Sequence, residues 1–112
     1  MRYSYLACPY AHRDPAIRQE RFEAVTQVLA QRYREGLPTY SPITHNHPLA
    51  TAHDLPGGWA FWSKFDLPIL LLANELVVLM LPGWIQSVGV TAEIEFASKH
   101  KILTSYIEYI KP

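Results

Sequence analysis

The clearest pattern along the chain is an unbroken apolar run that is followed by a turn and then an amphipathic segment. Residues 75–81, ELVVLML, carry six consecutive apolar side chains after the glutamate, and Pro82 and Gly83 follow at once. A short continuous apolar run predicts a strand that is covered on both faces, as in the middle of a parallel sheet. Residues 90–100 predict a helix. Ligands of open α/β sheets bind beyond the carboxyl ends of the strands, so residues 82–89 become the leading candidate for a site.

The first third of the chain alternates between strand and helix signals. Residues 2–7, RYSYLA, are aromatic and apolar and predict a first strand. Asp14 followed by Pro15 is typical of a helix start, because the aspartate caps free backbone N–H groups and the first helical position needs no N–H of its own. Apolar residues then recur at helical spacing until Gly36, and residues 37–41 predict a short second strand.

The middle of the chain has a weaker pattern. Residues 42–58 hold three prolines, two glycines and three histidines with little periodicity, which predicts a long loop of the kind that is usually functional or a lid. Helical spacing returns over residues 59–74, where Pro68 either kinks one helix or starts a second. Because the residue before a proline avoids the helical conformation, we expect a bend near Asp66 and Leu67.

The order of these elements predicts the fold class. With a last strand over residues 102–107, strands and helices alternate along the chain, which indicates an α/β domain over residues 1–112. We expect a three-layer parallel sheet of four to five strands, flavodoxin-like or Rossmann-like, with helices on both faces. Such a small sheet leaves edges to cover, so Tyr106, Tyr109 and Ile110 predict a homo-oligomer, a dimer or a tetramer.

Composition narrows the class of partner. Formal charge is zero and both signs are spread along the chain, which argues against a nucleic acid polymer or an anionic membrane and favours a small-molecule ligand. Residues 69–81 are the most apolar but too short to span a bilayer. Cys8 is the only cysteine, and no basic leader precedes an apolar core, so we expect a cytoplasmic protein without a signal peptide.

Cofactor and metal motifs are weak. Residues 8–14 follow the first strand without a glycine, so we expect no nicotinamide or ATP cofactor. His45 and His47 have the spacing of two metal ligands and His53 follows, but without a cysteine pair or an HExxH motif we expect no metal site. Cys8 is interpreted as a buried thiol in preference to a nucleophile, because no base is placed for it in the sequence.

Aromatic residues in GWAFWSKF either stack a ligand or fill a core. We expect Phe61 and Phe65 in the core and one of Trp59 and Trp62 in a pocket. Trp84 follows the third strand, where burial is harder to arrange, and is a further candidate.

Two carboxylates stand out. Asp66 interrupts an apolar segment, where it either caps the turn at Pro68 or has a function. Glu93 lies one turn into a helix, where an anion is favoured by the helix dipole with or without a function, and Glu95 allows the same interpretation.

YLACPY, the internal Asp66 and SVGVTAEIEFA together resemble the nucleoside 2-deoxyribosyltransferase superfamily. That superfamily includes the 2′-deoxynucleoside 5′-phosphate N-hydrolases and small uncharacterised bacterial members, which this chain resembles in length and in SPITHNHP. The resemblance implies that Glu93 is the nucleophile at the anomeric carbon, that Asp66 protonates the departing base and that Tyr5 holds the nucleophile. It also leads us to expect an ionised Glu93 and an Asp66 whose pKa is raised by burial.

The resemblance extends to the substrate. The transferases carry an aspartate six residues before the nucleophile, whereas this chain has Ser87, as the phosphate-accepting hydrolases do. We therefore expect a nucleoside or a nucleoside 5′-monophosphate as substrate, without a cofactor, and leave hydrolase and transferase open. The alternatives are a catalytically silent nucleotide-binding protein and a metal hydrolase built on the three histidines of the middle segment. The predicted substrate-binding residues are Ser87, Gly89, Tyr10 and Trp62.

Overall fold

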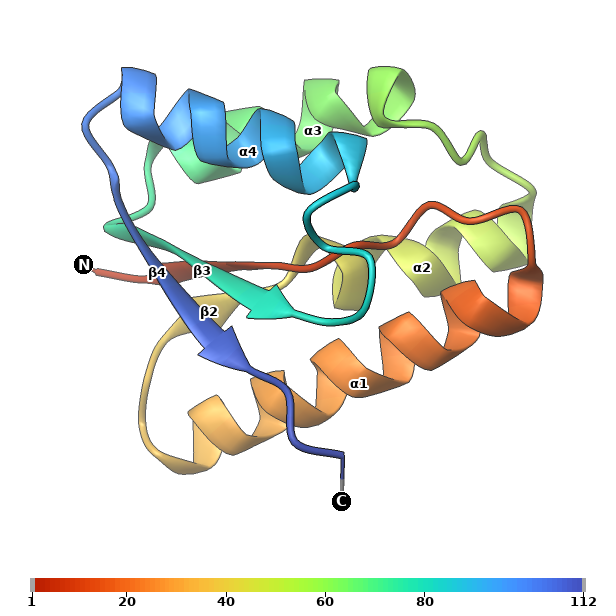
Figure 1. Cartoon of the computed structure of the whole chain (residues 1–112), viewed down its shortest axis with the longest axis horizontal. Helices are drawn as coiled ribbons and strands as arrows, with labels where there is room; N and C mark the ends of the chain where they lie inside the picture. The colour runs from red at the N-terminus through yellow and green to blue at the C-terminus, as the bar shows by residue number, and fades with distance from the viewer. Residues whose placement is uncertain (1, 112) are drawn as a thin grey trace.

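A computed structural model of the chain describes residues 2–111 and contains four helices and four strands (Figure 1). The elements in chain order are β1 (Ser4–Ala7), α1 (Pro15–Arg34), β2 (Thr39–Tyr40), α2 (Pro42–His53), α3 (Trp59–Leu71), β3 (Glu75–Met80), α4 (Val88–Lys99) and β4 (Leu103–Glu108).

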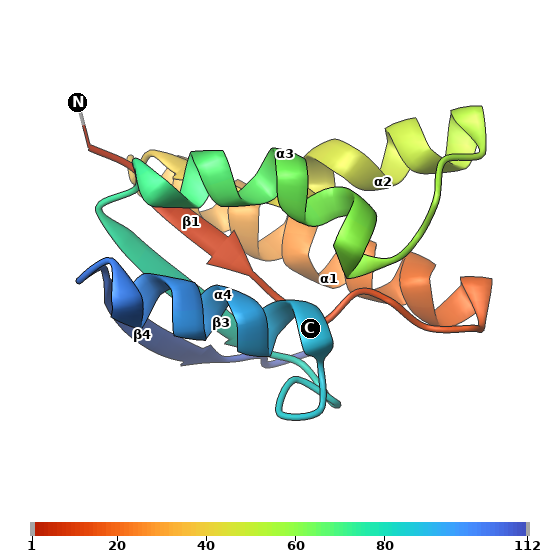
Figure 2. The same cartoon turned by 90° about the horizontal axis from the view of Figure 1, so that it is seen from above.

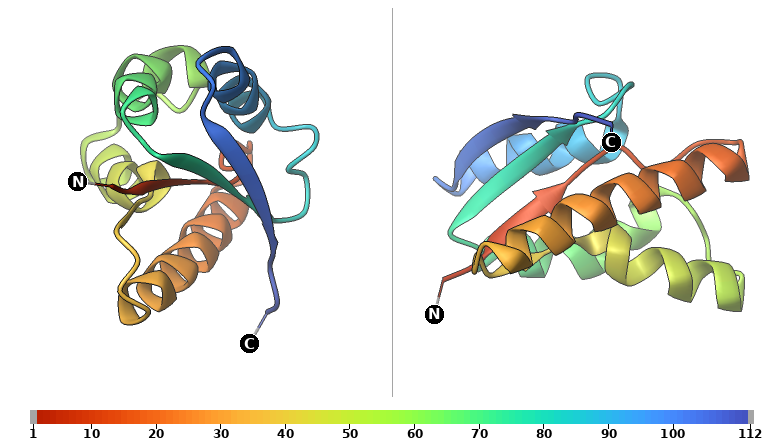
Figure 3. Two further views of the ribbon diagram at one scale, coloured as in Figure 1. Left: turned by 90° about the vertical axis from the view of Figure 1, so that its left-hand side faces the viewer. Right: turned by 90° about the horizontal axis from the view of Figure 1, so that it is seen from below.

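The four strands form one parallel sheet in the order β2-β1-β3-β4. Helix α1 covers one face, while α3 and α4 lie side by side over the other (Figures 2 and 3). The predicted α/β fold with a three-layer parallel sheet of the flavodoxin-like kind is therefore confirmed. Strand β1 is the switch point of this sheet, because the chain leaves it for a neighbour on one side, β2, and later returns to the other side as β3.

Strand β3 connects two hydrophobic clusters. Leu76 and Val78 point toward α3 and α4, whereas Val77 and Leu79 point toward α1, and all four are almost completely buried. Alternate side chains of a strand point to opposite faces, so a run that is buried on both faces must be apolar at every position. Each such side chain contributes roughly 1.5–3 kcal/mol through burial. The prediction of a central strand from the apolar run is confirmed.

The predicted loop over residues 42–58 is wrong, because most of it is the helix α2. Ser41 caps that helix, with its Oγ accepting a hydrogen bond of 3.1 Å from the backbone N–H of Thr44. Pro42 occupies the first turn, where its missing N–H costs nothing, as Pro15 does in α1. Pro48 lies inside the helix, and Asp54 ends it in the left-handed conformation at φ 51°. The three prolines hid a cap signal that the sequence contains.

Helix α3 continues through Pro68, so the alternative that a second helix starts at this proline is wrong. Pro68 and Lys64, four residues earlier, are both exposed, and water can therefore reach the carbonyl that the proline leaves without a partner. Phe65 is 51% exposed and does not belong to the core, and Phe61 is only half-buried. Both lie on the outer side of α3, because the inner side of the helix is filled by Leu70.

The edge strand β4 and the residues that follow it expose apolar side chains to solvent. Tyr106 is 46% exposed and Ile110 is 83% exposed, whereas Tyr109 is half-buried and its hydroxyl donates to Gln27 Oε1 on α1 at 3.5 Å. The homo-oligomer expected from these residues stays a prediction. Within residues 2–111, no helix combines the length and the apolar character needed to cross a lipid bilayer.

Candidate active site

A cavity of about 600 Å³ lies at the carboxyl ends of β1 and β3. In Figure 1 the arrowhead of β3 points toward the side of the molecule where the loops after β1 and β3 and helix α2 lie. The cavity is therefore at the switch point of the sheet, where ligands of this fold class bind. Its walls come from the loop after β1, from α2, from the start of α3 and from residues 86–93.

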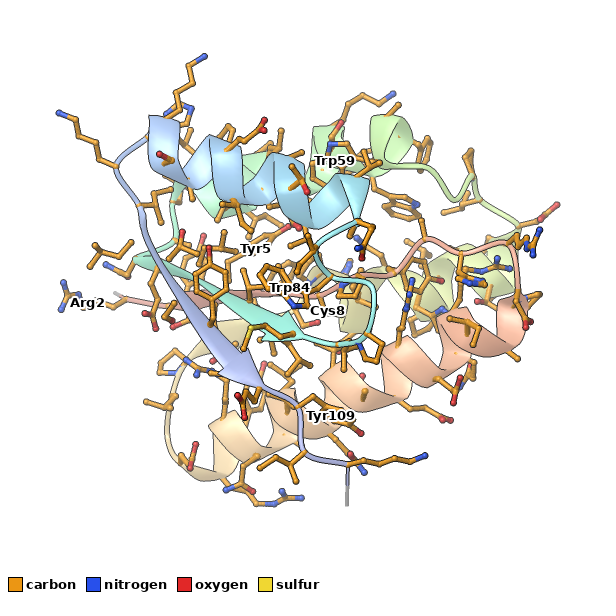
Figure 4. The ribbon with its side chains drawn as sticks, in the orientation of Figure 1. Arg2, Tyr5, Cys8, Trp59, Trp84 and Tyr109 are labelled. Atoms are coloured by element: carbon orange, nitrogen blue, oxygen red, sulfur yellow. The ribbon has the colours of Figure 1, made fainter. Side chains whose placement is uncertain are left out.

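The structure brings the predicted residues together from three segments that are distant in sequence, residues 5–10, 62–66 and 87–93. Tyr5 is completely buried beneath α4 and is not part of the cavity wall, but its hydroxyl donates to a cavity carboxylate (Figure 4). The other predicted residues all line the cavity: Tyr10, Trp62, Asp66, Ser87, Gly89 and Glu93.

Glu93 is held from behind by strand β1. It is 4% exposed, and its Oε2 accepts a short hydrogen bond from the Tyr5 hydroxyl. Burial and the neighbouring charge of Glu93 raise the pKa of Tyr5 well above its ordinary value, so the phenol keeps its proton and acts as a donor. Oε2 is thereby occupied, and Oε1 is the oxygen of Glu93 that remains for a ligand.

Asp66 is held by a polar pair from α2. It is 3% exposed, and its Oδ1 accepts a hydrogen bond of 2.9 Å from Asn46 Nδ2. The Oδ1 of Asn46 is in turn 2.8 Å from Nδ1 of His45. Asn46 lies within the THNHP segment but is not among the predicted site residues, because the spacing of the two histidines there points only to metal ligands. An amide between two histidines just after a helix cap was the available signal.

Both carboxyl groups titrate far from their ordinary range. Burial raises the pKa of Asp66 to about 6, although the hydrogen bond from Asn46 and the charge of His45 oppose the shift. Burial raises the pKa of Glu93 to about 8, opposed by the Tyr5 hydroxyl and reinforced by the charge of Asp66. The expected ionised Glu93 is therefore wrong for the free protein, because its burial outweighs its single donor. Between about pH 6 and 8 the pair holds one proton.

Tyr10, which also lines the cavity, is held by His47. The Tyr10 hydroxyl makes a short hydrogen bond with Nδ1 of His47, and Nε2 of His47 lies 2.9 Å from Gln19 Oε1. The imidazole also stacks on Phe22 with ring centroids 4.4 Å apart. His45 and His47 thus serve different partners, and no cluster of three or more metal-ligating side chains occurs within residues 2–111.

Two tryptophans, not the expected one, line the cavity. Trp62 is buried and its Nε1 donates to the carbonyl of Pro56 at 2.7 Å. Trp59 lies beside the first turn of α4 (Figure 4), where a Cβ on Gly89 would come within 3.4 Å of its ring. Trp84 lies outside this cavity and packs 5.6 Å from Tyr106.

Ser87 lines the cavity and also caps a helix. Its Oγ accepts a hydrogen bond of 3.2 Å from the N–H of Val90 and so caps α4. Cys8 also borders the cavity, but it is buried, and burial raises the pKa of its thiol. This agrees with the interpretation of Cys8 as an inert buried thiol.

A protein-family model described as "Domain of unknown function (DUF1937)" matches residues 2–108. The chain belongs to this family. The match covers the whole sheet and every residue of the cavity wall, so the site described above is part of the DUF1937 domain itself. A comparison with curated proteins finds no match.

Proposed function

We propose that this DUF1937 protein cleaves the N-glycosidic bond of a nucleoside or nucleoside 5′-monophosphate through a glycosyl-enzyme at Glu93. The observation that supports it most is the convergence of two buried carboxyl groups, Asp66 and Glu93, on one cavity, with Tyr5 donating to the second. Strongly perturbed carboxyl groups in a cleft are typical of acid, base and nucleophile roles. Cleavage with retention needs one carboxylate at the sugar and one proton donor at the base.

The proposed reaction runs in two balanced steps. Oε1 of Glu93 attacks the anomeric carbon, the bond from that carbon to the base nitrogen breaks, and its electron pair leaves with the base. Asp66 gives its proton to the base. Water, or the nitrogen of a second base, then attacks the anomeric carbon and gives a proton back to Asp66, and Glu93 departs as a carboxylate.

This chemistry needs the shared proton on Asp66. In the free protein Glu93 holds the shared proton instead, because the pKa of Glu93, about 8, exceeds the pKa of Asp66, about 6. The arrangement with the proton on Asp66 is therefore the minor one in the free protein. A bound nucleoside acts against this preference, since a base nitrogen accepts from protonated Asp66 and positive charge develops on the sugar beside Glu93.

A 5′-phosphate would bind at the start of α4. Ser87 already accepts the N–H of Val90, so its hydroxyl hydrogen is available to an anion, and the first N–H groups of the helix favour negative charge. The variant Ser87→Asp keeps a good cap residue and adds a negative charge. We expect it to lower kcat/KM for 5′-monophosphates at least tenfold and to leave free nucleosides nearly unchanged. An equal loss of kcat/KM for both kinds of substrate would contradict a role of Ser87 in phosphate recognition.

The experiment that tests the function is base release from a panel of nucleosides and their 5′-monophosphates, with ribose and deoxyribose, followed by chromatography. A 2′-deoxy-2′-fluoro substrate slows the second step, so mass spectrometry should then find the sugar attached to Glu93. An added acceptor base distinguishes transfer from hydrolysis. A sugar adduct on any other residue would contradict the proposal.

The second candidate is a silent nucleotide-binding protein of the same fold, which the raised pKa of Glu93 favours because a protonated glutamate is no nucleophile. Thermal shifts on nucleotide binding, without base release from any panel member between pH 6 and 9, would support this alternative. Activity that appears as Glu93 ionises would reject it.

A further inference from the structure

We infer that Tyr10 is a specificity-determining residue that offers the ligand only a hydrogen-bond acceptor, and that it selects a sugar that carries a free hydroxyl over an analogue that lacks this hydroxyl. The inference rests on the proposed function for the identity of the ligand. It rests on a chain of four polar groups, which starts at Glu23 and ends at Tyr10, for the direction of the hydrogen bond.

The direction of each hydrogen bond in this chain follows from the carboxylate of Glu23, which can only accept. Gln19 Nε2 donates to Glu23 Oε2 at 3.2 Å. Because the nitrogen end of the Gln19 amide faces Glu23, the oxygen end faces away from it. The amide oxygen Oε1 therefore faces Nε2 of His47 at 2.9 Å. An amide oxygen has no hydrogen to give, so Nε2 of His47 carries one.

His47 is neutral, and its second nitrogen must therefore accept. The ring is buried and stacks on Phe22, and burial together with the charge of Arg18 lowers the pKa of His47, with Glu23 opposing the shift. A neutral imidazole with its hydrogen on Nε2 has a lone pair on Nδ1. The Tyr10 hydroxyl, which contacts Nδ1, is consequently the donor in that hydrogen bond.

Tyr10 has thus committed its only hydrogen before a ligand arrives. Tyr10 borders the cavity. Its oxygen also takes a side-chain hydrogen bond from Arg18, and the lone pair that remains can accept from a ligand group that donates. A sugar hydroxyl fits this requirement because it has a hydrogen to donate, whereas an analogue without that hydroxyl has none. Sites built to bond one hydroxyl reject an analogue that lacks it, because the protein group is then left without a partner.

The first test compares nucleosides that lack one sugar hydroxyl at a time, 3′-deoxy and 5′-deoxy, in the wild type and in Tyr10→Phe. In the wild type we expect kcat/KM to fall about tenfold or more for one of the two analogues. In Tyr10→Phe the parent nucleoside should fall by a similar factor and that discrimination should disappear. Tyr106→Phe, which alters a tyrosine on β4 outside the cavity, should keep the wild-type ratios. Unchanged ratios in Tyr10→Phe would overturn the inference.

The second test does not depend on turnover. Nitrogen NMR of the histidine rings should find His47 neutral at pH 7, with its hydrogen on Nε2 and an accepting Nδ1. A hydrogen on Nδ1 would overturn the inference even if nucleosides are cleaved. If no nucleoside is cleaved, binding of the same analogues by thermal shift tests Tyr10 separately, and loss of the wild-type preference in Tyr10→Phe would still support its role.

Discussion

Two hollows within residues 2–111 lie beside the loop after β3, and the smaller one holds the two buried carboxyl groups. The larger hollow, of about 1150 Å³, lies between α1 and residues 80–86, and we call it the α1 groove. Its charged side chains, such as Glu20 and Lys111, are exposed, and Arg21 is engaged with backbone carbonyls. The candidate active-site cavity instead holds Asp66 and Glu93 almost completely buried.

The difference shows that volume is a poor guide to a site. Burying a carboxyl group costs free energy unless it is neutral or well paired, so two in one cavity are a stronger sign of function than a large, solvated groove. Every buried polar side-chain atom within residues 2–111 has a partner. In the cavity Oε1 of Glu93 remains for a ligand, whereas the lining of the α1 groove within residues 2–111 has no buried ionisable group of this kind.

The largest expected effect is the loss of base release in Glu93→Gln. The amide keeps the shape and can still accept from Tyr5, but it cannot form the glycosyl-enzyme, so we expect a loss of at least about 1000-fold. Base release by chromatography measures it, with circular dichroism as the check on folding. Activity within tenfold of the wild type would remove Glu93 as nucleophile.

The same variant should change how stability depends on pH. In the unfolded chain Glu93 ionises near its ordinary 4.5, whereas in the folded protein its pKa is about 8. Stability that is present below pH 4.5 is therefore lost as pH rises to 8. Glu93→Gln removes this loss and should stabilise the protein by on the order of 3 kcal/mol at pH 8. Urea unfolding at pH 5 and pH 8 measures it, and parallel curves for the two proteins would contradict the burial argument.

Next in size is Asp66→Asn, which removes the proton donor. We expect a loss of about 100-fold to 10000-fold with ordinary nucleosides, the range typical of general acid catalysis. A nucleoside whose base is already cationic, such as an N7-methylated purine, needs no proton and should lose much less. Equal losses for both kinds of substrate would assign Asp66 a structural role.

A smaller effect is expected for Asn46→Ala. Without the donor at 2.9 Å, the carboxylate of Asp66 is less stabilised and its pKa should rise further above 6. His45, Glu93, Tyr5 and Tyr40 also face this carboxyl group and remain in place. Carbon NMR of the Asp66 carboxyl measures the shift, and activity should fall by less than about tenfold. His45→Ala is the matched control with a smaller shift, and an unchanged Asp66 titration in Asn46→Ala would contradict the arrangement.

The smallest effect is expected in the α1 groove. Glu20→Gln changes an exposed carboxylate there and should leave base release within about twofold of the wild type. A loss as large as that of Asn46→Ala would mean that the groove takes part in binding, and the contrast between the two hollows would fail.

Local sequence signals determined the strands, the long helix α1, the helix α4 and the position of Glu93 near its start. These signals act over a few residues: alternation, helical spacing and a cap such as Asp14 before Pro15. The same signal at Ser41 and Pro42 marked α2, although the prolines and histidines after it concealed the helix.

The tertiary structure decided most of the contacts between side chains of the candidate site. Tyr10 meets His47 across 37 positions of sequence and Asn46 meets Asp66 across 20, whereas the contact of Tyr5 with Glu93 across 88 positions was implied by the family resemblance. Such contacts depend on the order of parallel strands and on which helix covers which face, and no local pattern encodes them. The order of the two carboxyl pKa values is of the same kind, because it follows from how deeply each group is buried and how many donors the neighbouring elements supply.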